Sequence, residues 1–395
     1  MRIALIADAF PPMRSSGAVQ LRDLSRELAR LGHEVTVLVP AAGQGRWILE
    51  RYHEVVVVRL KALRTRDTNY LRRALGELLM PFLMLRNFRA SPAAARRFDA
   101  VLWYSPTIFL GPIVKALKRE HGCPAYLIIR DIFPEWAADM GLMRRGLLYR
   151  LFKAVADFQY KVADIIGVQA RGNLAFFDKW ARAGTRVEVL ENWLSEGPER
   201  RCPIDLAATA LAGRRIFVYA GNMGIAQGMG KLIDLAQRLK DDERLGFVFV
   251  GRGSAARQLR DDARGRGLDN LLFFDEIDPD EVAGLYAQCD VGLVALDPRH
   301  RTHNIPGKFI SYMHAGLPVL ASINPGNDLV ALVAEEGVGR VSTDPAGTDL
   351  PALALALVEE TGGDRSARCR ALAARRFSSA GAARQIVAAL SSMRT

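Results

Sequence analysis

The class of the fold is decided by the stretch Asp290-Val-Gly-Leu-Val-Ala-Leu296 and by the polar loop and the helical segment Phe309-Ile-Ser-Tyr-Met-His-Ala315 that follow it. The first segment is continuously apolar, as in a strand that is buried on both faces. The second has the pattern of a short helix that ends at Gly316. Pro318-Val-Leu-Ala321 then begins another apolar strand. This order of elements predicts a βαβ unit in a parallel sheet.

The loop between these elements, residues 299–308, is polar and cationic. A loop at the carboxyl end of a buried strand that runs into a helix N-terminus is where open α/β sheets bind anionic ligands. Lys308 begins the helix, and because helix starts favour acids, a cation there indicates an anionic ligand. His303 and Asn304 either contact that ligand or hold the loop together. The histidines have no carboxylate cluster at ligand spacing, so no metal site is expected.

The same alternation of apolar strands and helices recurs along the 395 residues, which is too long for one ordinary core. We therefore predict an α/β protein of two Rossmann-like, doubly wound domains that face each other across a cleft. The expected parts are a first domain over residues 1–195, a linker over 196–214, a second domain over 215–370, and a C-terminal helix over 371–395 that packs back toward the first domain.

Composition narrows the class of protein. Hydrophobic residues make up 50% and charged residues 25%, which are ordinary globular values. The four cysteines stand far apart, which fits a reducing cytoplasm better than a disulfide framework. The start of the chain reads as a strand and not as a signal peptide, and no apolar run is long enough to span a membrane. The expected location is the cytoplasm.

The positive charge is concentrated in the first half of the chain. Residues 1–195 contain 30 Lys and Arg against 18 Asp and Glu, within a net charge of +11. Basic residues over 59–97 flank the apolar helical segment Leu71–Leu85. This region is either a solvated charged face or a basic amphipathic helix on an anionic membrane surface. Nucleic acid is not the expected partner, because no interleaved aromatic residues and no recognition motif accompany the charge.

Two glycine-rich turns follow successive strands of the second half. Residues 220–230 contain Gly221, Asn222 and Gln227, and Gly251-Arg-Gly253 follows the next strand. Glycine lets backbone N–H groups approach a phosphate at a helix N-terminus. The dinucleotide fingerprint is absent, because no acidic residue ends the next strand. The pair of turns beside the cationic loop predicts a diphosphate site, and the alternative is two tight turns with no ligand.

The first half places polar residues at the ends of two other strands. Arg130, Asp131 and Glu135 follow one strand, and Tyr104 and Ser105 end the strand before it. Carboxylates there suit acid–base chemistry on a polar acceptor. The alternative is a helix cap or an Arg–Asp pair.

Together these stretches resemble the retaining glycosyltransferases of family 4, which have the GT-B fold. Phe10-Pro-Pro with Gly17, residues 24–37 and the ending Gly316–Ala321 are similar to that family's motifs. The resemblance implies a UDP-sugar held mainly by the second domain and a polyprenyl-diphosphate-linked acceptor reached from the first domain. It also implies a metal-independent reaction with no cofactor besides the donor.

Four segments are most similar to the L-fucosamine transferase subgroup of the WbuB type, namely residues 129–136, 221–227, 302–308 and 326–329. This likeness implies transfer of an N-acetylated amino-deoxyhexose, such as N-acetyl-L-fucosamine, in the synthesis of bacterial O-antigen or capsule. It also implies a peripheral position at the inner face of the plasma membrane.

The sequence departs from the broader family at several site positions. The family's paired glutamates fall on His303 and Ser311, and its phosphate-binding Arg and Lys fall on Asn222 and Gln227. Its donor-contacting histidine falls on Tyr104. On the subgroup's pattern, the lost positive charge is replaced by Lys308, Arg252 and Arg301.

The expected site residues fall into three groups. The catalytic residues are Asp131, Glu135 and His303. Donor binding is expected from Gly17, Gly221, Asn222, Gln227, Arg252, Arg301, Thr302, Asn304, Gly307, Lys308 and Ser311. The acceptor side is expected at Tyr104, Ser105 and Arg130. Two other classes stay open, namely a non-catalytic subunit that binds a nucleotide sugar or docks on a membrane, and a UDP-sugar epimerase of the same fold.

Overall fold

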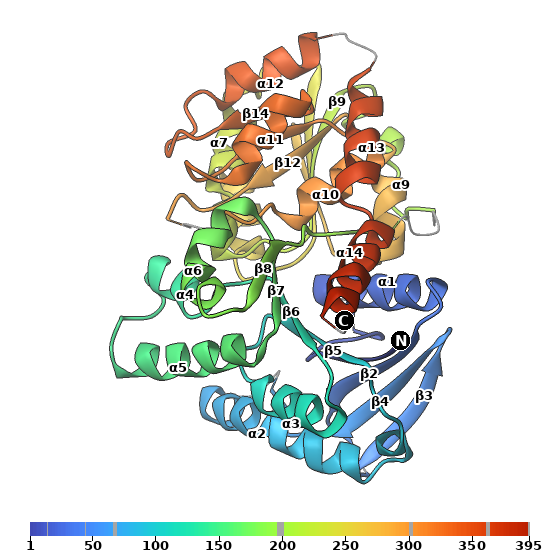
Figure 1. Cartoon of the computed structure of the whole chain (residues 1–395). Coiled ribbons are helices and arrows are strands. Elements are labelled where there is room, and N and C mark those ends of the chain that lie inside the picture. The colour runs from blue at the N-terminus through green and yellow to red at the C-terminus, as the bar shows by residue number, and fades with distance from the viewer. Residues whose placement is uncertain are drawn as a thin grey trace. The chain divides into compact units, whose positions relative to one another are not determined.

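The computed structural model describes residues 1–13, 15–43, 45–65, 69–195, 201–299, 303–360 and 364–393. The chain forms two compact units. Unit 1 consists of Met1–Trp193 and Ser379–Thr395, and unit 2 consists of Leu194–Ser378. Each unit is a sheet covered by helices on both faces (Figure 1).

Unit 1 is built on a sheet whose described strands run in the order β3-β4-β2-β1-β5-β6-β7-β8. All neighbours are parallel except β3 and β4, which are antiparallel. The chain order reverses between β1 and β5, which pair directly through Leu5 and Leu102. The strands are β1 Arg2–Ile6, β2 Glu34–Ala41, β3 Trp47–Tyr52, β4 Val55–Lys61, β5 Ala100–Ser105, β6 Ala125–Ile129, β7 Ile165–Val168 and β8 Arg186–Val189.

Two helical layers cover this sheet because its central strands are apolar on both sides. In Figure 1, α2 and α3 lie below the sheet with α5 beside them, and α1 and α14 lie on its other face. The unit 1 helices are α1 Ser16–Arg30, α2 Tyr70–Arg89, α3 Gly111–His121, α4 Glu135–Asp139, α5 Leu147–Val162, α6 Asp178–Ala181 and α14 Ser379–Ser392. Short 3-10 helices cover Pro92–Ala95 and Arg171–Phe177.

Unit 2 has a parallel sheet in the order β11-β10-β9-β12-β13-β14. The chain winds outward from β9 in one direction and from β12 in the other, which is the doubly wound arrangement with a switch point between these two strands. The strands are β9 Arg215–Ala220, β10 Leu245–Val250, β11 Leu271–Phe274, β12 Val291–Ala295, β13 Val319–Ser322 and β14 Gly339–Ser342.

The helices of unit 2 also form two layers. One layer contains α7 and α8 with α12, and the other contains α9, α10, α11 and α13. Their bounds are α7 Gly230–Arg238, α8 Ala256–Gly265, α9 Val282–Tyr286, α10 Gly307–Ala315, α11 Asp328–Glu336, α12 Leu350–Glu359 and α13 Arg365–Arg376. Short 3-10 helices cover Leu206–Ala208, Ile225–Gln227 and Pro279–Glu281.

The predicted fold class is confirmed, and the structure differs from the sequence-based elements at the edges. The edge strands β3 and β14 were not predicted, because they are short or partly exposed and lack a continuous apolar pattern. The single helix expected over residues 371–395 is instead two helices, α13 and α14, which belong to different units. The chain crosses between units after Trp193 and again after Ser378, and Leu194 and Ser378 form an isolated parallel bridge.

Candidate functional site

The loops that follow β9, β10 and β12 meet at the switch point of unit 2. The backbone N–H of Gly221 donates to the Val250 carbonyl at 2.9 Å, and the N–H of Met223 donates to the Arg252 carbonyl at 2.8 Å. The N–H of Asp297, just after β12, donates to the Ala226 carbonyl at 3.0 Å. These bonds hold the three loops as one piece at the carboxyl ends of the strands, where doubly wound sheets bind ligands.

Glycine is required at the turns because the backbones approach very closely. Gly221, Gly251 and Gly253 have φ values of 130°, 142° and 156°, which residues other than glycine rarely adopt. A Cβ atom built on Gly251 would collide with the carbonyl oxygen of Gly221, and one on Gly253 would collide with that of Met223. The turns are therefore tight backbone packing in their own right, and they also leave a surface without side chains.

Lys308 lies beside this surface at the start of α10. Its ammonium nitrogen is 4.6 Å from the centroid of the Tyr219 ring, and a Cβ on Gly221 would be 3.2 Å from the same nitrogen. The first turn of α10 contains no acidic residue, and no carboxylate of the described residues forms an ion pair with Lys308. Burial lowers the pKa of Lys308 to about 8. A half-buried cation without a described counter-ion, at a helix N-terminus, is a site for an anion.

The polar side chains of the glycine-rich loop bind each other. The side-chain amide oxygen of Gln227 accepts from the Gly224 backbone N–H at 3.0 Å and from the side-chain amide of Asn222 at 3.3 Å. The Asn222 backbone carbonyl accepts from the Tyr219 hydroxyl at 2.6 Å. In the structure these two side chains therefore shape the loop, and the N–H groups of Gly221, Met223 and Gly224 are also bonded within the protein.

Arg252 is exposed and already has a partner. Its guanidinium forms an ion pair with Glu276 at 2.8 Å, and its side chain is 77% exposed. An exposed pair of this kind is weak and can exchange for a ligand anion. Arg252 therefore contributes less fixed positive charge than Lys308.

His303 and Asn304 are held to the start of α11. The Nδ1 atom of His303 is 2.9 Å from the Gly326 carbonyl oxygen and 3.5 Å from the Asp328 carboxylate. The Asn327 amide donates to the Asn304 carbonyl at 3.3 Å. Of the two roles expected for this pair, the structure displays the bracing of the loop.

Four other residues predicted to bind the donor lie in or next to this loop, namely Ser311, Gly307, Arg301 and Thr302. The Ser311 hydroxyl donates to the Gly307 carbonyl one turn earlier in α10, at 3.3 Å. Gly307 is exposed as the first residue of that helix. Arg301 and Thr302 lie outside the described residues.

Three further polar residues border the same strand ends and were not predicted. The Lys231 amine, at the start of α7, donates to the Ser322 hydroxyl at the end of β13, at 3.3 Å. Burial lowers the pKa of Lys231, and the charge of Asp297 opposes that shift. Asp297 is itself bound by the Arg299 guanidinium at 2.9 and 2.8 Å. Only the strand order brings these residues together, so no local pattern along the chain reveals them.

Unit 1 has a second polar cluster, at its own switch point between β1 and β5. The Arg130 side chain is buried, and its guanidinium carbon lies 4.2 Å from the Trp193 ring centroid and 5.5 Å from that of Tyr104. The Tyr104 hydroxyl donates to the side-chain amide oxygen of Gln20 at 2.7 Å, and burial raises the pKa of Tyr104 to about 12. Tyr104 is therefore neutral at physiological pH, and stacking on Trp193 fixes the direction of the Arg130 cation.

Gly17 and Asp131 border this cluster. A Cβ on Gly17, in the first turn of α1, would be 3.2 Å from the Tyr104 ring, so glycine keeps the approach to Tyr104 open. Asp131 has solvent access, yet the surrounding protein raises its pKa, an effect that the Arg130 charge opposes. A carboxylate beside a fixed cation can orient a hydroxyl group and accept its proton.

Two predicted residues of unit 1 are engaged in structural contacts instead. Ser105 is buried, its hydroxyl donates to the Thr107 carbonyl, and it accepts from the Gln159 amide at 3.1 Å, so it faces the core. Glu135 forms an ion pair with Lys153 of α5 at 3.1 Å. The prediction of Ser105 and Glu135 as site residues rested on strand-end position alone, which does not say which way a side chain points.

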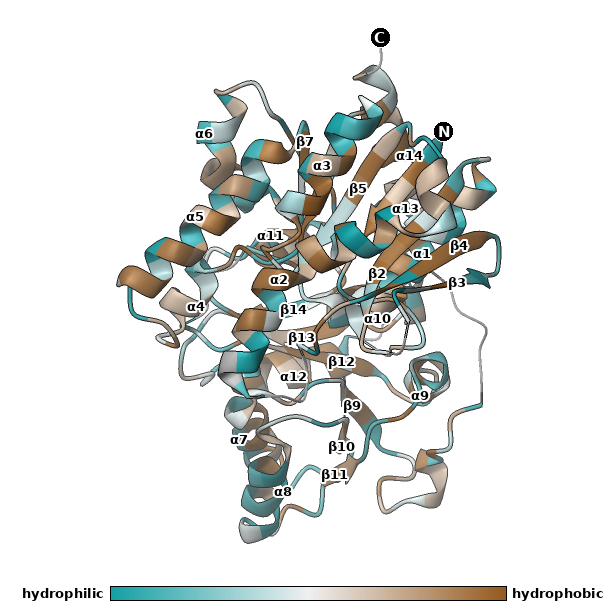
Figure 2. Cartoon of the chain, turned by 90° about the horizontal axis from the view of Figure 1, so that it is seen from below, coloured by the Kyte–Doolittle hydropathy of each residue, from teal (hydrophilic) through white to brown (hydrophobic). Residues whose placement is uncertain are grey.

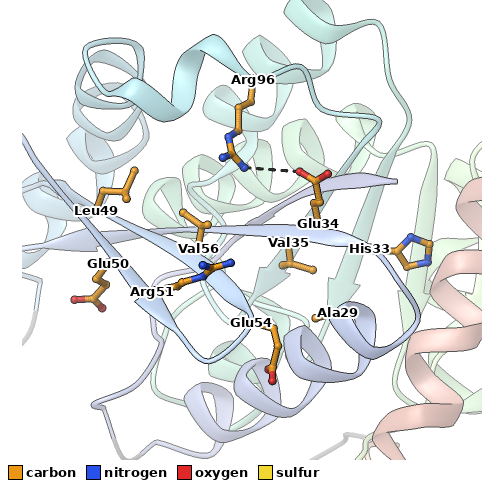
Figure 3. A pocket seen from close by; sticks show the side chains of 10 residues that line it. All are labelled: Ala29, His33, Glu34, Val35, Leu49, Glu50, Arg51, Glu54, Val56 and Arg96. Atoms are coloured by element: carbon orange, nitrogen blue, oxygen red, sulfur yellow. Dashed lines mark ion pairs between the residues drawn. The ribbon is translucent and has the colours of Figure 1, made fainter.

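A separate hollow of about 520 Å³ lies in unit 1, at the amino ends of β2 and β4 (Figure 3). Its lining residues include Leu49, Arg51 and Glu54, and an ion pair of 3.7 Å joins Arg96 to Glu34 at its edge. Because Glu34 and Val56 of its lining lie at the amino ends of β2 and β4, the hollow is at the end of the sheet away from Tyr104. It has no part in the site described above.

Metal-binding clusters and membrane-spanning helices are both absent from the described residues. No group of three or more His, Cys, Asp or Glu in that part of the chain is arranged to hold a metal ion. None of the helices seen there has both the length and the apolar character needed to cross a membrane.

Two Rossmann-like units, each with its polar cluster at the switch point of a parallel sheet, define the class of two-domain GT-B proteins. A superposition on sucrose-phosphate synthase from Thermosynechococcus elongatus covers 100% of this chain and 99% of that protein. The TM-score is 0.73 and the sequence identity is 16%. Anabaena Alr3699/HepE, in a complex with UDP-glucose, gives a TM-score of 0.70, 16% identity, and coverage of 99% of this chain and 100% of that one. At these identities the likeness establishes the fold alone.

Comparisons of the amino-acid sequence with known families and proteins identify the family of this chain. Residues 17–193 match the glycosyl transferase 4-like domain, and residues 214–358 match the glycosyl transferases group 1. A probable glycosyltransferase WbjE of Pseudomonas aeruginosa is 26% identical over 282 residues, which is 70% of this chain and 69% of the relative. A putative colanic acid biosynthesis glycosyl transferase WcaI of Escherichia coli (strain K12) is 26% identical over 341 residues, 80% and 82% respectively. The chain belongs to the glycosyltransferases that these two domain models describe, and its two units have the GT-B fold.

Proposed function

We propose that the protein is a retaining glycosyltransferase that uses a UDP-sugar donor and a polyprenyl-diphosphate-linked saccharide acceptor. The observation that carries the proposal is the position of Lys308, beside the glycine turns and at the N-terminus of α10. The transferred sugar is an N-acetylated amino-deoxyhexose, such as N-acetyl-L-fucosamine, by the resemblance of residues 129–136 and 302–308 to that subgroup. The name of the Escherichia coli relative, a colanic acid enzyme, supports a role in bacterial surface polysaccharide.

The proposed chemistry follows from where charge develops. As the bond between the sugar and UDP breaks, negative charge builds on the β-phosphate, and oriented N–H groups and cations stabilise it. In this proposal the N–H groups at the start of α10 and the Lys308 ammonium group supply these contacts, beside the turn at Gly221. Arg252 adds an exchangeable cation at the rim. Because protein groups supply this positive charge, the proposal needs no metal ion and no cofactor.

The acceptor role falls to unit 1. Arg130, fixed on Trp193, is suited to bind an anionic or hydroxyl-rich acceptor, and Asp131 is suited to orient the attacking hydroxyl and take its proton. A polyprenyl-linked acceptor is presented at the inner face of the plasma membrane, so the proposed location is peripheral to that surface.

The proposal is tested by UDP release. The protein is incubated with a panel of UDP-sugars, with and without a polyprenyl-diphosphate-linked saccharide, and UDP is quantified. We expect release that depends on both the acceptor and one class of UDP-sugar. No release with any donor, while UDP itself still binds, would overturn the proposal. Conversion of the donor sugar without acceptor would instead identify an epimerase.

One observation favours a second candidate, a non-catalytic subunit that binds a nucleotide sugar. His303 and Ser311 occupy the positions of the family's paired glutamates, and both hydrogen-bond to backbone carbonyls. In that case UDP-sugars bind by calorimetry with no acceptor-dependent UDP release. The UDP-release assay, run beside calorimetry on the same preparation, separates these outcomes.

The two carboxylates of unit 1 should respond differently to neutralisation. Asp131→Asn is expected to lower kcat by about 100-fold with little change in thermal stability, since a general base or hydroxyl-orienting group contributes about that much. Glu135→Gln is expected to keep most of the activity and to lower Tm, because it breaks the ion pair with Lys153. Steady-state kinetics and thermal denaturation on both variants check the contrast, and equal kinetic losses would contradict it.

UDP affinity should depend on pH through Lys308. Its pKa in the free protein is lowered from 10.5 to about 8, so the ammonium form predominates below pH 8 and is lost above it. We therefore expect the affinity for UDP to be constant near pH 7 and to fall as pH rises through about 8 to 9.5. In Lys308→Arg the guanidinium stays charged, so its affinity should be flat over the same range. Calorimetry in buffers of constant ionic strength measures both profiles.

A further inference from the structure

The outer side of α2 carries exposed apolar side chains. Leu75, Leu78, Leu79 and Phe82 are exposed and lie at helical spacing on one side, whereas Met84 of the same helix is buried in the core. Arginines are placed around this stripe, at Arg72 before it and at Arg86 and Arg89 after it. A helix that is apolar on its outer side as well as its inner side has an unpartnered face.

A second apolar surface lies on α5, and the sequence-based expectation did not include it. Leu147 is 84% exposed, and Leu148 and Leu151 are also exposed in the first two turns of the helix. Leu142 is exposed in the preceding loop. Basic residues again surround the patch, namely Arg144, Arg145 and Arg150, and all three are exposed.

These two patches belong to the same layer of unit 1. Both α2 and α5 pack beside α3, and their inner residues, such as Met84 and Ala156, join one core cluster on one face of the sheet. Their outer sides therefore point away from that face. Figure 2 shows brown, hydrophobic segments on α2 and at the free end of α5, in the helical layer next to the viewer. We call this pair of patches the α2/α5 surface: Leu75, Leu78, Leu79, Phe82, Leu142, Leu147, Leu148 and Leu151.

We propose that the α2/α5 surface docks unit 1 on an anionic lipid bilayer, with its leucines and Phe82 in the interfacial layer. This inference rests on the proposed function in one respect, namely that the acceptor is carried by a lipid. Basic residues flank both patches, which complements anionic headgroups, and arginines can extend from the edges of an inserted apolar face toward phosphates. Part of this positive charge neutralises nearby acids, since Glu77 pairs with Arg73, Glu120 with Arg89 and Asp139 with Arg145.

Two separated helices constrain the orientation of unit 1 on a bilayer more than a single helix would. A single amphipathic helix fixes only a line of contact, whereas α2 and α5, on either side of α3, fix a plane. A plane of contact sets the orientation of the whole unit 1 sheet with respect to the bilayer. It therefore also sets the height at which Arg130 and Asp131 meet the lipid-linked saccharide.

The test is vesicle sedimentation of the full chain with phosphatidylcholine vesicles and with vesicles that also contain phosphatidylglycerol. We expect binding to increase with the anionic lipid and to weaken with salt. Two triple variants remove three apolar side chains each from the interface: Leu147→Gln/Leu148→Gln/Leu151→Gln on α5 and Leu75→Gln/Leu78→Gln/Phe82→Gln on α2. Each should bind the vesicles at least about ten-fold more weakly than the unmodified protein. Equal binding to neutral and anionic vesicles, or unchanged binding of both variants, would overturn the proposal.

Three controls establish that lipid binding belongs to the α2/α5 surface. Leu31→Gln replaces an exposed leucine at the end of α1, on the opposite face of the sheet, and should bind vesicles like the unmodified protein. Sedimentation velocity without lipid detects a second copy as the occupant: dimerisation that the α5 variant abolishes, together with no lipid binding, would contradict the proposal. UDP binding by calorimetry should be unchanged in every variant, so a failure of membrane docking is distinguishable from a failure of the donor site.

Discussion

Lys308→Ala is expected to lower kcat/KM for the UDP-sugar by about 100-fold or more, because one oriented charge contact to a developing anion contributes about that much. The contact is hard to replace, since Arg252 is an exposed side chain at the rim and the neutral side chains of Asn222 and Gln227 bind each other. The affinity for UDP should fall in parallel. Steady-state kinetics and calorimetry measure the two effects separately.

A second substitution, Lys308→Met, separates a role in donor binding from a role in holding the loop, through its effect on thermal stability. Burial lowers the pKa of Lys308, so at pH 7 the charged form is held in the folded protein at a cost. Linkage then requires that this cost is present below pH 8 and fades as pH rises toward the ordinary lysine value. Lys308→Met should therefore lose UDP binding and yet raise Tm at pH 7. A fall in Tm together with the loss of binding would show that Lys308 holds the loop and does not serve the donor.

Gly251→Ala is expected to cost the folded protein about 3 kcal/mol or more and to abolish donor binding. The new methyl group would collide with the carbonyl oxygen of Gly221, and the φ of 142° is strained for any residue with a Cβ atom. Neither the backbone of β9 nor that of β10 can move away without breaking the parallel ladder between them. Urea denaturation measures the loss of stability, and calorimetry measures the loss of UDP binding.

Gly265→Ala serves as the matched control. Gly265 lies at the end of α8, where nothing is close to a new Cβ, and alanine favours helix. The stability of this variant should stay within about 1 kcal/mol of that of the unmodified protein. If Gly251→Ala behaves in the same way, the turn after β10 is not the rigid backbone surface that the donor site needs.

Much of the fold could be predicted because its signals are local. Runs such as those of β9 and β12 are apolar on both faces, which only a parallel sheet covered by two helical layers can bury. The turns at Gly221 and Gly251 and the start of α10 at Gly307 are equally local, since they depend on φ preferences and helix-end chemistry. Edge strands such as β14 escaped prediction because partial exposure removes the apolar pattern.

The directions of side chains were not predictable in the same way. Tyr104 and Ser105 are adjacent in β5, and both were expected at the site. Successive side chains of a strand point to opposite faces, and here Ser105 binds Gln159 in the core while Tyr104 borders Arg130. Glu135 likewise pairs with Lys153, a residue of a helix whose packing no local pattern reveals.

The sequence by itself determined the succession of strands and helices, the glycine turns and the cation at the start of α10, because each depends on neighbours along the chain. Only the tertiary structure decided which strand ends became a site. Placing β9 next to β12 brings Gly221 beside Lys308, and placing β1 next to β5 brings Gln20 to Tyr104. The same packing left the leucines of α5 without a partner. These outcomes depend on pairings between distant segments, which are set by the burial of the whole core and not by any one stretch of sequence.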